Sequence, residues 1–431
     1  MNIIDSKSPE KCQVSPIRFV PGEWDEKTLL DAAGMKKDLI VAGPFGSNLK
    51  VSDYRDEGIP IIRLQNIDYG KFIDKEIKYI SPEKARELAY HSFRAGDLVL
   101  AKLGEPIGKT CIVPDYFQDG VVVADVVRIR VANGLADKKF IMYSLNSVAT
   151  KNQLINGTIG STRPRVNLDQ IRDIRISVPP LNEQRKIAAI LTSVDAVIEQ
   201  TDTIIAQTER MKKGLMQELF TKGNDEWPSY KLEELTGIVT KGTTPTTYGY
   251  HFTNSGINFI KIESLSDQGD LISENLAHID EETNFALRRS ILQENDILFS
   301  IAGALGRVYV VTRDVLPANT NQALSIIRIN NDSTILVNYL KYFLMGPSIR
   351  HVIKSIYSQS AQSNLSLEQV RNFLIKVPPL LEQKKVIAIL STIDANLSIE
   401  KEFRIRLDRI KNGLMQDLLT GRIRVKVDGH A

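Results

Sequence analysis

Cysteine is nearly absent from this chain. Only Cys12 and Cys111 occur among its 431 residues, too few and too far apart in the sequence for a disulfide framework, so the composition fits a reducing compartment. No apolar run approaches the ~20 residues that a membrane-spanning helix needs, and the first residues do not form a secretory signal peptide. We therefore expect a cytoplasmic protein that has no membrane partner.

Patterns that would mark a catalytic or metal centre are also lacking. No Gly-x-Ser-x-Gly nucleophile turn occurs. Pro179-Pro180 and Pro378-Pro379 are each followed by leucine and lack the Asn or Asp of an adenine-methyltransferase tetrapeptide. The histidines are isolated from one another and from the cysteines, without metal-ligand spacing; they are His91, His251, His278, His351 and His430. We expect no catalytic residue, metal or cofactor in this chain.

One glycine-rich stretch resembles a phosphate-binding loop but departs from its spacing. Gly104-Glu105-Pro106-Ile107-Gly108-Lys109-Thr110 has three residues between the glycines, whereas four are needed for successive backbone N–H groups to wrap a phosphate. The corresponding Gly303-Ala304-Leu305-Gly306-Arg307 has no Lys-Thr pair and falls short of a dinucleotide fingerprint. A turn between two strands is the better interpretation.

Charge is balanced rather than one-sided. The 55 Lys and Arg residues against 52 Asp and Glu residues give a net charge of +3, which does not by itself indicate a nucleic-acid partner but permits local basic faces. Charged residues make up 25% of the chain and apolar ones 42%, as in ordinary globular proteins. The length predicts roughly two to four compact domains.

What the chain does contain is an internal repeat. Residues 178–221 match residues 377–420 without a gap, at a constant offset of 199. Both copies begin Val-Pro-Pro-Leu-x-Glu-Gln, and both carry Gly-Leu-Met-Gln further along, at residues 214–217 and 413–416. Each copy follows a longer and more divergent block, so the sequence predicts two tandem halves.

Each copy is predicted to form one long helix. The proline pairs exclude helix just upstream, so the helices are expected to begin near Leu181 and Leu380, and Gly223 and Gly421 are natural ends. The interval of about 40 residues corresponds to roughly 60 Å of helix.

Apolar residues inside both copies recur in alternating steps of four and three, which indicates a seam against another helix. A second stripe beside the first, Ile190, Val197, Ile204, Met211 and Leu215, indicates more than one packing partner, although core packing alone would also explain both stripes. The simplest use of a matched pair is an intramolecular antiparallel coiled coil. The expected seam is Ile187, Leu191, Val194, Ile198, Thr201, Ile205 and Thr208, then Val386, Leu390, Ile393, Leu397, Phe403, Leu407, Ile410, Leu414 and Leu418.

The two divergent blocks share a skeleton of short β-branched runs broken by Gly, Pro and Asp, which is typical of strands joined by long loops. Helical stretches near residues 83–89 and 337–344 make each block mixed α and β. The matched stretches are residues 58–63 with 256–261, 96–100 with 295–299, and 127–129 with 327–329. One fold used twice with different surface residues suggests two related but different targets.

This order of blocks and helices closely resembles the specificity (S) subunit of Type I restriction–modification systems. The resemblance covers essentially the whole chain and is most specific in the repeated helices. It implies an α+β fold in which two mixed α/β target recognition domains are separated by two long helices that form an antiparallel coiled coil, as pseudo-twofold tandem halves. The expected parts are recognition domain 1 (1–177), spacer helix 1 (178–222), recognition domain 2 (223–376), spacer helix 2 (377–421) and a C-terminal tail (422–431).

The resemblance also implies that the chain has no activity alone. Each recognition domain would read one half of a split site in double-stranded DNA. The helices would dock two methyltransferase (M) subunits and, through them, the restriction (R) subunits. Those partners would use S-adenosylmethionine for N6-adenine methylation, and ATP with Mg for cleavage.

Loops that end strands or precede the long helices are the expected DNA contacts, because sequence readout needs polar side chains on a rigid scaffold. Arginine suits guanine, and amide side chains suit adenine. The candidates in the first half are Ser47, Asn48, Lys50, Arg63, Gln65, Asn66, Ser161, Thr162, Arg163 and Arg165. Those in the second are Lys241, Thr243, Thr244, Lys261, Glu263, Ser358, Gln359, Gln362 and Asn364.

Two other interpretations remain open at this point. The chain would also suit a non-catalytic coiled-coil scaffold that carries two protein- or glycan-binding domains. An enzyme that uses residues 104–110 on nucleotides is the other. Salt dependence of DNA affinity separates the first from a DNA reader, and nucleotide binding by the isolated chain tests the second.

Overall fold

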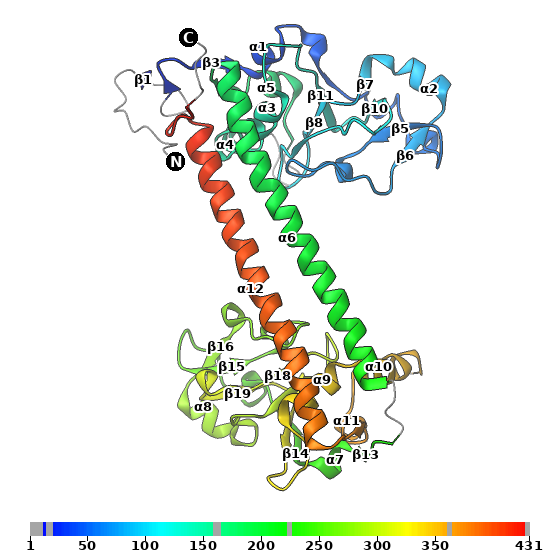
Figure 1. The fold of residues 1–431 in the computed structure, drawn as a ribbon, viewed down its shortest axis with the longest axis vertical. Coiled ribbons are helices and arrows are strands. Elements are labelled where there is room, and N and C mark those ends of the chain that lie inside the picture. Colours follow the sequence, from blue (N-terminus) through cyan, green and yellow to red (C-terminus); the bar gives the residue numbers. More distant parts are fainter. Residues whose placement is uncertain (1–11, 14–19, 158–164, 222–225, 360–363, 427–431) are drawn as a thin grey trace. The chain divides into compact units, whose positions relative to one another are not determined.

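The computed structural model describes residues 12–13, 20–157, 165–221, 226–359 and 364–426, and the chain divides into two compact units (Figure 1). Unit 1 combines residues 1–201 with 403–431, and unit 2 comprises residues 202–402. The two predicted long helices are α6 (Leu181–Thr221) and α12 (Leu380–Leu418). Each helix contributes one segment to each unit.

Unit 1 contains a mixed α and β block with two four-stranded sheets. The strands are β1 (Cys12–Gln13), β2 (Val20–Pro21), β3 (Asp25–Thr28), β4 (Ile40–Ala42), β5 (Ile59–Ile62), β6 (Lys78–Ile80), β7 (Ser92–Phe93), β8 (Leu98–Ala101), β9 (Thr110–Ile112), β10 (Gly120–Val122), β11 (Val126–Ile129) and β12 (Arg175–Val178). The helices are α1 (Leu29–Ala33), α2 (Pro82–Glu87), α3 (Lys138–Leu145), α4 (Val148–Asn156) and α5 (Leu168–Arg172). One sheet has the order β4-β11-β8-β9, and the other β6-β5-β10-β7 with β5 and β10 parallel.

Unit 2 repeats this plan. Its strands are β13 (Ser229–Lys231), β14 (Thr236–Lys241), β15 (Ile257–Ile260), β16 (Ala277–Ile279), β17 (Ile297–Ser300), β18 (Val308–Val310), β19 (Ala318–Thr320), β20 (Leu324–Ile329) and β21 (Leu374–Lys376). Its helices are α7 (Leu232–Leu235), α8 (Glu281–Ala286), α9 (Val337–Met345), α10 (Pro347–Gln359) and α11 (Leu367–Arg371). The sheet β14-β20-β17-β18 corresponds to β4-β11-β8-β9, and β16-β15-β19 keeps the parallel pair, β15 with β19.

The strand pairing corrects one expected match between the halves. Residues 127–129 and 327–329 are not equivalent, because Ile129 pairs with Leu98 whereas Ile327 pairs with Ile297, the counterpart of Leu98. Ile129 is therefore equivalent to Ile327, and the next residues, Arg130 and Arg328, are counterparts. Each forms a two-pronged ion pair with a buried aspartate at 2.6–2.9 Å, Asp97 and Asp296 respectively.

A buried glutamine fastens each block to the start of its long helix. Gln184 accepts a hydrogen bond from the backbone N–H of Asp137 at 2.9 Å, and Gln383 accepts one from that of Leu336 at 2.8 Å. Asp137 and Leu336 are the N-cap residues of α3 and α9. Both amides also donate to the carbonyl of the first proline before the helix. The repeated Pro-Pro-Leu-x-Glu-Gln motif is therefore a junction between block and helix.

The described part of the expected C-terminal tail packs into unit 1. The Arg424 guanidinium lies 2.8 Å from the buried carboxylate of Glu183, which also accepts a hydrogen bond from the Trp24 indole at 3.2 Å. Val425 is buried in the core that contains Trp24. Residues 422–426 thus close the block at the start of α6 rather than extend from it.

The two long helices pack against each other within each unit. In unit 1, Leu191 and Met415 belong to one buried cluster, and in unit 2 Leu390 and Phe220 belong to another. Seam positions follow the four-and-three spacing at a constant offset of 199. They are Ile187, Leu191, Val194, Ile198, Thr201, Ile205, Thr208, Lys212, Leu215 and Leu219 on α6, and Val386, Leu390, Ile393, Leu397, Glu400, Arg404, Leu407, Lys411, Leu414 and Leu418 on α12.

The expected seam was wrong at two positions on α12. Phe403 and Ile410 are 44% and 52% exposed. The heptad instead continues through Glu400, Arg404 and Lys411, which are half-buried. The steps of four and three persist through these polar residues, and the two apolar side chains lie on a neighbouring face.

Cys111 is a fully buried free thiol in unit 1. Burial raises the pKa of this thiol to about 12, so it stays neutral and unreactive near neutral pH. Its role is core packing.

We predict that Leu191→Ala loosens unit 1 and Leu390→Ala loosens unit 2, because each side chain is fully buried in the core of its own unit. Each change should lower the free energy of unfolding by about 2–5 kcal/mol. Thermal unfolding measures the loss, and hydrogen–deuterium exchange locates it. The exposed neighbours Ser193→Ala and Ser391→Ala are controls; a leucine variant as stable as its control would contradict the packed seam.

Candidate nucleic-acid interface

In unit 1, five chain segments meet where strands β4, β5, β8 and β10 end. Backbone hydrogen bonds hold them together: Lys102 donates to the carbonyl of Asp125 at 3.0 Å, Val166 donates to that of Lys102 at 3.2 Å, and Val123 donates to that of Ile62 at 3.1 Å. We call this surface loop edge 1; it comprises residues 43–50, 63–66, 102–104, 123–125 and 165–166.

Unit 2 has the same arrangement, which we call loop edge 2. Ile301 donates to the carbonyl of Ala323 at 2.8 Å, and Leu365 donates to that of Ile301 at 2.8 Å. The backbone N–H and hydroxyl of Thr244 donate to the Gln322 side chain at 3.1 and 2.6 Å. The segments are residues 242–249, 261–264, 301–303, 321–323 and 364–365.

Both edges need a glycine at the point where the first segment leaves its strand. A Cβ on Gly43 would lie 2.0 Å from the Val123 carbonyl oxygen, and one on Gly242 would lie 1.8 Å from that of Thr320. No side chain fits at these distances. The close backbone approach fixes where residues 43–50 and 242–249 begin.

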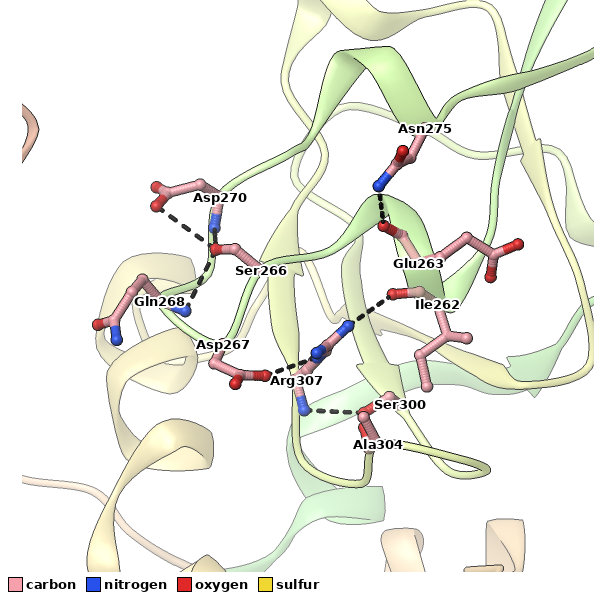
Figure 2. Close-up of polar contacts among 10 residues, drawn as sticks. All are labelled: Ile262, Glu263, Ser266, Asp267, Gln268, Asp270, Asn275, Ser300, Ala304 and Arg307. Carbon is pink, nitrogen blue, oxygen red and sulfur yellow. Dashed lines mark hydrogen bonds and ion pairs between the residues drawn. The ribbon is translucent and has the colours of Figure 1, made fainter. Parts of the chain in front are cut away.

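Arg307, in the connection between β17 and β18, holds the loop that follows β15, as Figure 2 shows. The Arg307 guanidinium donates to Asp267 at 2.6 Å and to the Ile262 carbonyl at 3.2 Å, and the Arg307 backbone donates to the Ser300 hydroxyl. Asn275 donates to the carbonyl of Glu263 at 2.8 Å. The loop after β15 is thereby fixed at both of its ends.

The glycine-rich stretch of the first half has the same supporting role. Residues 102–109 connect the antiparallel strands β8 and β9, as expected for a strand-to-strand turn. Lys109 lies 2.9 Å from Asp68, which is the counterpart of the Arg307–Asp267 pair. The Thr110 hydroxyl is buried and donates to the carbonyl of Gly108. The Lys109 ammonium and the Thr110 hydroxyl, which a nucleotide phosphate would need, are thus paired within the protein.

Loop edge 1 brings together most of the described candidates from the first half. Ser47, Asn48 and Lys50 are exposed on the segment after β4. The Arg165 guanidinium lies 2.8 Å from Asp125 and is 57% exposed. Arg63 and Gln65 both turn toward Glu76, where the Arg63 guanidinium donates to the backbone carbonyl and Gln65 to the carboxylate at 3.3 Å.

Asn66 is a structural residue, and its assignment as a DNA contact was wrong. The side chain is fully buried. Its oxygen accepts from the Arg63 backbone at 3.0 Å, and its amide donates to the carbonyls of Ile73 and Lys75 at 3.0 Å each. All of its hydrogen-bonding groups are engaged in holding the loop, so none is available to a base.

Loop edge 2 contains most of the described candidates from the second half. Thr243 and Thr244 are half-buried in it, and the exposed Lys241 is the last residue of β14, directly before it. Lys261 and Glu263 form an ion pair with each other at 2.7 Å. This pairing lowers the pKa of the Glu263 carboxyl through the Lys261 hydrogen bond. Asn364 is exposed beside residues 301–303.

Two DNA-contact candidates lie outside the loop edges, and four lie outside the residues that the structure describes. Ser358 and Gln359 were expected in a loop but are the last residues of α10, where the Ser358 hydroxyl donates to the Ser355 carbonyl at 2.9 Å. The remaining candidates lie outside the described residues; they are Ser161, Thr162, Arg163 and Gln362.

Sequence reasoning missed Lys102, Asp125 and Gln322, which lie at the centre of the two edges. Burial lowers the pKa of the half-buried Lys102 ammonium, the Asp125 carboxylate counteracts that effect, and the Arg165 charge adds to it. The counterpart of Lys102 in loop edge 2 is the buried Ile301. A single lysine after a strand carries no sequence signal, so only the fold reveals this position.

The two edges differ in charge. Loop edge 1 places Lys102 and Arg165 around Asp125, which gives a local excess of positive charge with guanidinium and ammonium donors. In loop edge 2 the equivalent positions hold the uncharged Ile301, Ala323 and Asn364, and Thr244 and Gln322 add neutral hydroxyl and amide groups nearby. The same framework therefore offers two different patterns of donors and acceptors.

Comparisons with known proteins agree with this tandem organisation. A family model described as Type I restriction modification DNA specificity domain matches the chain twice, at residues 45–210 and 224–409. The chain is 23% identical to the putative type I restriction enzyme MjaX specificity subunit of Methanocaldococcus jannaschii, over 97% of both chains. It is 22% identical to the EcoKI specificity subunit of Escherichia coli, over 96% of this chain and 88% of the relative.

Solved structures show the same fold. A chain from a type I R-M system structure covers 93% of this chain and 99% of itself, with a TM-score of 0.57 and 18% identity. The type I restriction–modification S subunit from M. genitalium covers 92% and 96%, with a TM-score of 0.54 and 15% identity.

Proposed function

Because the chain belongs to the Type I restriction–modification DNA specificity family, with two copies of its domain, we propose that each half reads one half of a bipartite DNA site. The chain is then the sequence-recognition subunit and not the catalytic one. The observation that carries the proposal is the duplicated loop edge. One backbone framework holds five converging segments twice, with different polar side chains.

Side-chain chemistry supports a different half-site for each edge. Loop edge 1 offers a guanidinium and an ammonium, which suit the O6 and N7 acceptors of guanine or backbone phosphates. Loop edge 2 offers amides and hydroxyls, which suit adenine. The alternative interpretation, a scaffold that binds proteins or glycans, is not supported to the same extent by these contacts or by the relatives.

We assign residues 1–177 and 223–376 to the two recognition domains and residues 178–222 and 377–421 to the spacer helices. On each helix an apolar stripe beside the seam lies open to solvent. Val197, Ile204 and Met211 on α6 are 41%, 37% and 52% exposed. The stripe of α12 holds Ile389, Phe403 and Ile410, at 42%, 44% and 52% exposure.

The exposed stripes support two identical partners. Ile389, Phe403 and Ile410 are the repeat counterparts of Ile190, Ile204 and Met211, all at the offset of 199. Exposed apolar rows of this kind mark protein–protein contact sites. We propose that one methyltransferase (M) subunit docks on each stripe and that restriction (R) subunits join through M. S-adenosylmethionine, ATP and Mg would be used by those partners.

The proposed function predicts a methylation pattern that depends on this chain. Cells that carry this gene with its neighbouring methyltransferase gene should show N6-methyladenine at one split motif, mapped across the genome. Cells that lack only this gene should lose the motif completely. An unchanged methylome, with the methyltransferase expressed, would contradict DNA recognition by this chain.

Lys102→Met and Arg165→Ala should each weaken DNA binding about 10–100-fold, or ~1–3 kcal/mol, through the half-site that residues 1–177 read. A base contact will appear as relaxed specificity at one position, and a phosphate contact as a smaller salt dependence of affinity. Competition binding of the assembled methyltransferase to DNA altered in either half-site measures both. Lys139→Ala, an exposed lysine on α3, is the charge control. Equal loss at both half-sites would refute the assignment.

Met211→Asp or Ile410→Asp should reduce M-subunit binding at least tenfold, because a carboxylate in an apolar contact must be desolvated. Each single variant should retain one M subunit, and the double variant none, as measured by light scattering of the purified complex. Ala206→Asp adds the same charge at an exposed position on another face of α6. Full binding of two M subunits by the double variant would rule out the stripes as docking sites.

A further inference from the structure

The apolar seam between the long helices is interrupted by a lysine at the same repeat position in both copies. Lys212 on α6 and Lys411 on α12 are 199 residues apart in the sequence and continue the four-and-three spacing. The Lys212 side chain is only 5% exposed, and that of Lys411 is 21% exposed. A charged ammonium at such a position must be compensated locally.

Each lysine meets an aspartate of the other helix within its own unit. In unit 2 the Lys212 ammonium lies 2.5 Å from Asp394, and in unit 1 the Lys411 ammonium lies 2.6 Å from Asp195. The aspartates are also repeat counterparts. The pairing is therefore the same interaction made twice, once in each unit.

A tyrosine from the recognition block completes each pair. The hydroxyl of Tyr143, on α3, donates to Asp195 at 2.7 Å, and that of Tyr342, on α9, donates to Asp394 at 2.8 Å. We call the sets Tyr143–Asp195–Lys411 and Tyr342–Asp394–Lys212 the seam triads. Each joins three elements: a block helix, the long helix that follows that block, and the other long helix.

The tyrosines are rigid parts of the triads. Tyr143 and Tyr342 are 3% and 4% exposed. Burial raises the pKa of both hydroxyls well above the usual range, and the adjacent aspartate adds to the effect. Both phenols thus remain protonated donors. In unit 2 the half-buried Lys341 adds a second ammonium, 5.7 Å from the Tyr342 ring centre.

The triads distinguish one alignment of the helices from its alternatives. An apolar heptad seam alone tolerates a slip by one heptad, because leucine and isoleucine replace each other at little cost. A slip would separate each lysine from its aspartate and leave an uncompensated charge among apolar side chains. It would also break the tyrosine hydrogen bond to the block.

We propose that the seam triads are positioning elements that fix the register of α6 against α12 and the seat of each block on the helix pair, and so select the gap between the DNA half-sites. The proposal rests on the proposed function. It deepens that function by assigning gap selectivity to six named residues.

The test compares methylation of DNA substrates that carry both half-sites at the native gap or at gaps one base pair longer or shorter. The substrates are methylated by the complex of this chain with its M subunits. Wild type should strongly prefer the native gap. Lys212→Met with Lys411→Met should reduce that preference at least tenfold while base preference within each half-site stays unchanged. Lys401→Met, which breaks the exposed Lys401–Glu209 pair between the same helices, is the matched control and should keep the wild-type preference.

Two further variants keep the outcome decisive. Tyr143→Phe with Tyr342→Phe removes only the hydroxyl donors and should relax gap preference in the same direction, even where the lysine variants fail to assemble. The charge-reversed pair Lys212→Asp with Asp394→Lys should form the ion pair of unit 2 in the opposite sense and so restore part of the gap preference. Lower thermal stability with an unchanged gap preference in the assembled variants overturns the proposal. Wild type that methylates no specific sequence at any gap instead contradicts the proposed function.

Discussion

The attachment of each block to its long helix depends on a buried glutamine, and the rest of the architecture depends on that attachment. Gln184 and Gln383 accept from the backbone N–H of the N-cap residues of α3 and α9 and donate to the carbonyl of a proline that cannot continue a helix. A buried amide with unpaired groups would be costly, so the junction has one geometry. Because that geometry occurs twice, the seam positions, the triads and the loop edges all recur with it.

The long helices and the strands β5, β8, β11, β15, β17 and β20 were predictable because their signals are local. Proline pairs mark where α6 and α12 begin, and β-branched runs mark the strands. The seam was not predictable where charged residues take part in it. Beyond Leu397 the predicted leucines are interspersed with Glu400, Arg404 and Lys411, whereas the apolar Phe403 and Ile410 face solvent. A polar residue becomes a seam residue only through its partner, as Lys411 does through Asp195.

The candidate interface was predictable as a set of loops but not as a set of residues. Loops that follow strands were correctly taken as the polar surface. Their convergence, however, comes from sheet order and from backbone hydrogen bonds, such as that of Lys102 with Asp125. For the same reason Asn66, whose amide could contact a base, instead hydrogen-bonds within its own loop. Lys102, which belongs to no motif, lies at the centre of loop edge 1.

The division between backbone and side chain explains how one framework can serve two targets. Loop edges 1 and 2 are held by equivalent main-chain bonds and by glycines at Gly43 and Gly242, none of which constrains the exposed side chains. Lys102 and Ile301 occupy the same position without disturbing those bonds. If the loop edges read DNA as proposed, readout can change through a few edge residues while the junction glutamines and seam triads keep each block in place. In that proposal recognition and positioning are carried by separate residues, so one can vary without the other.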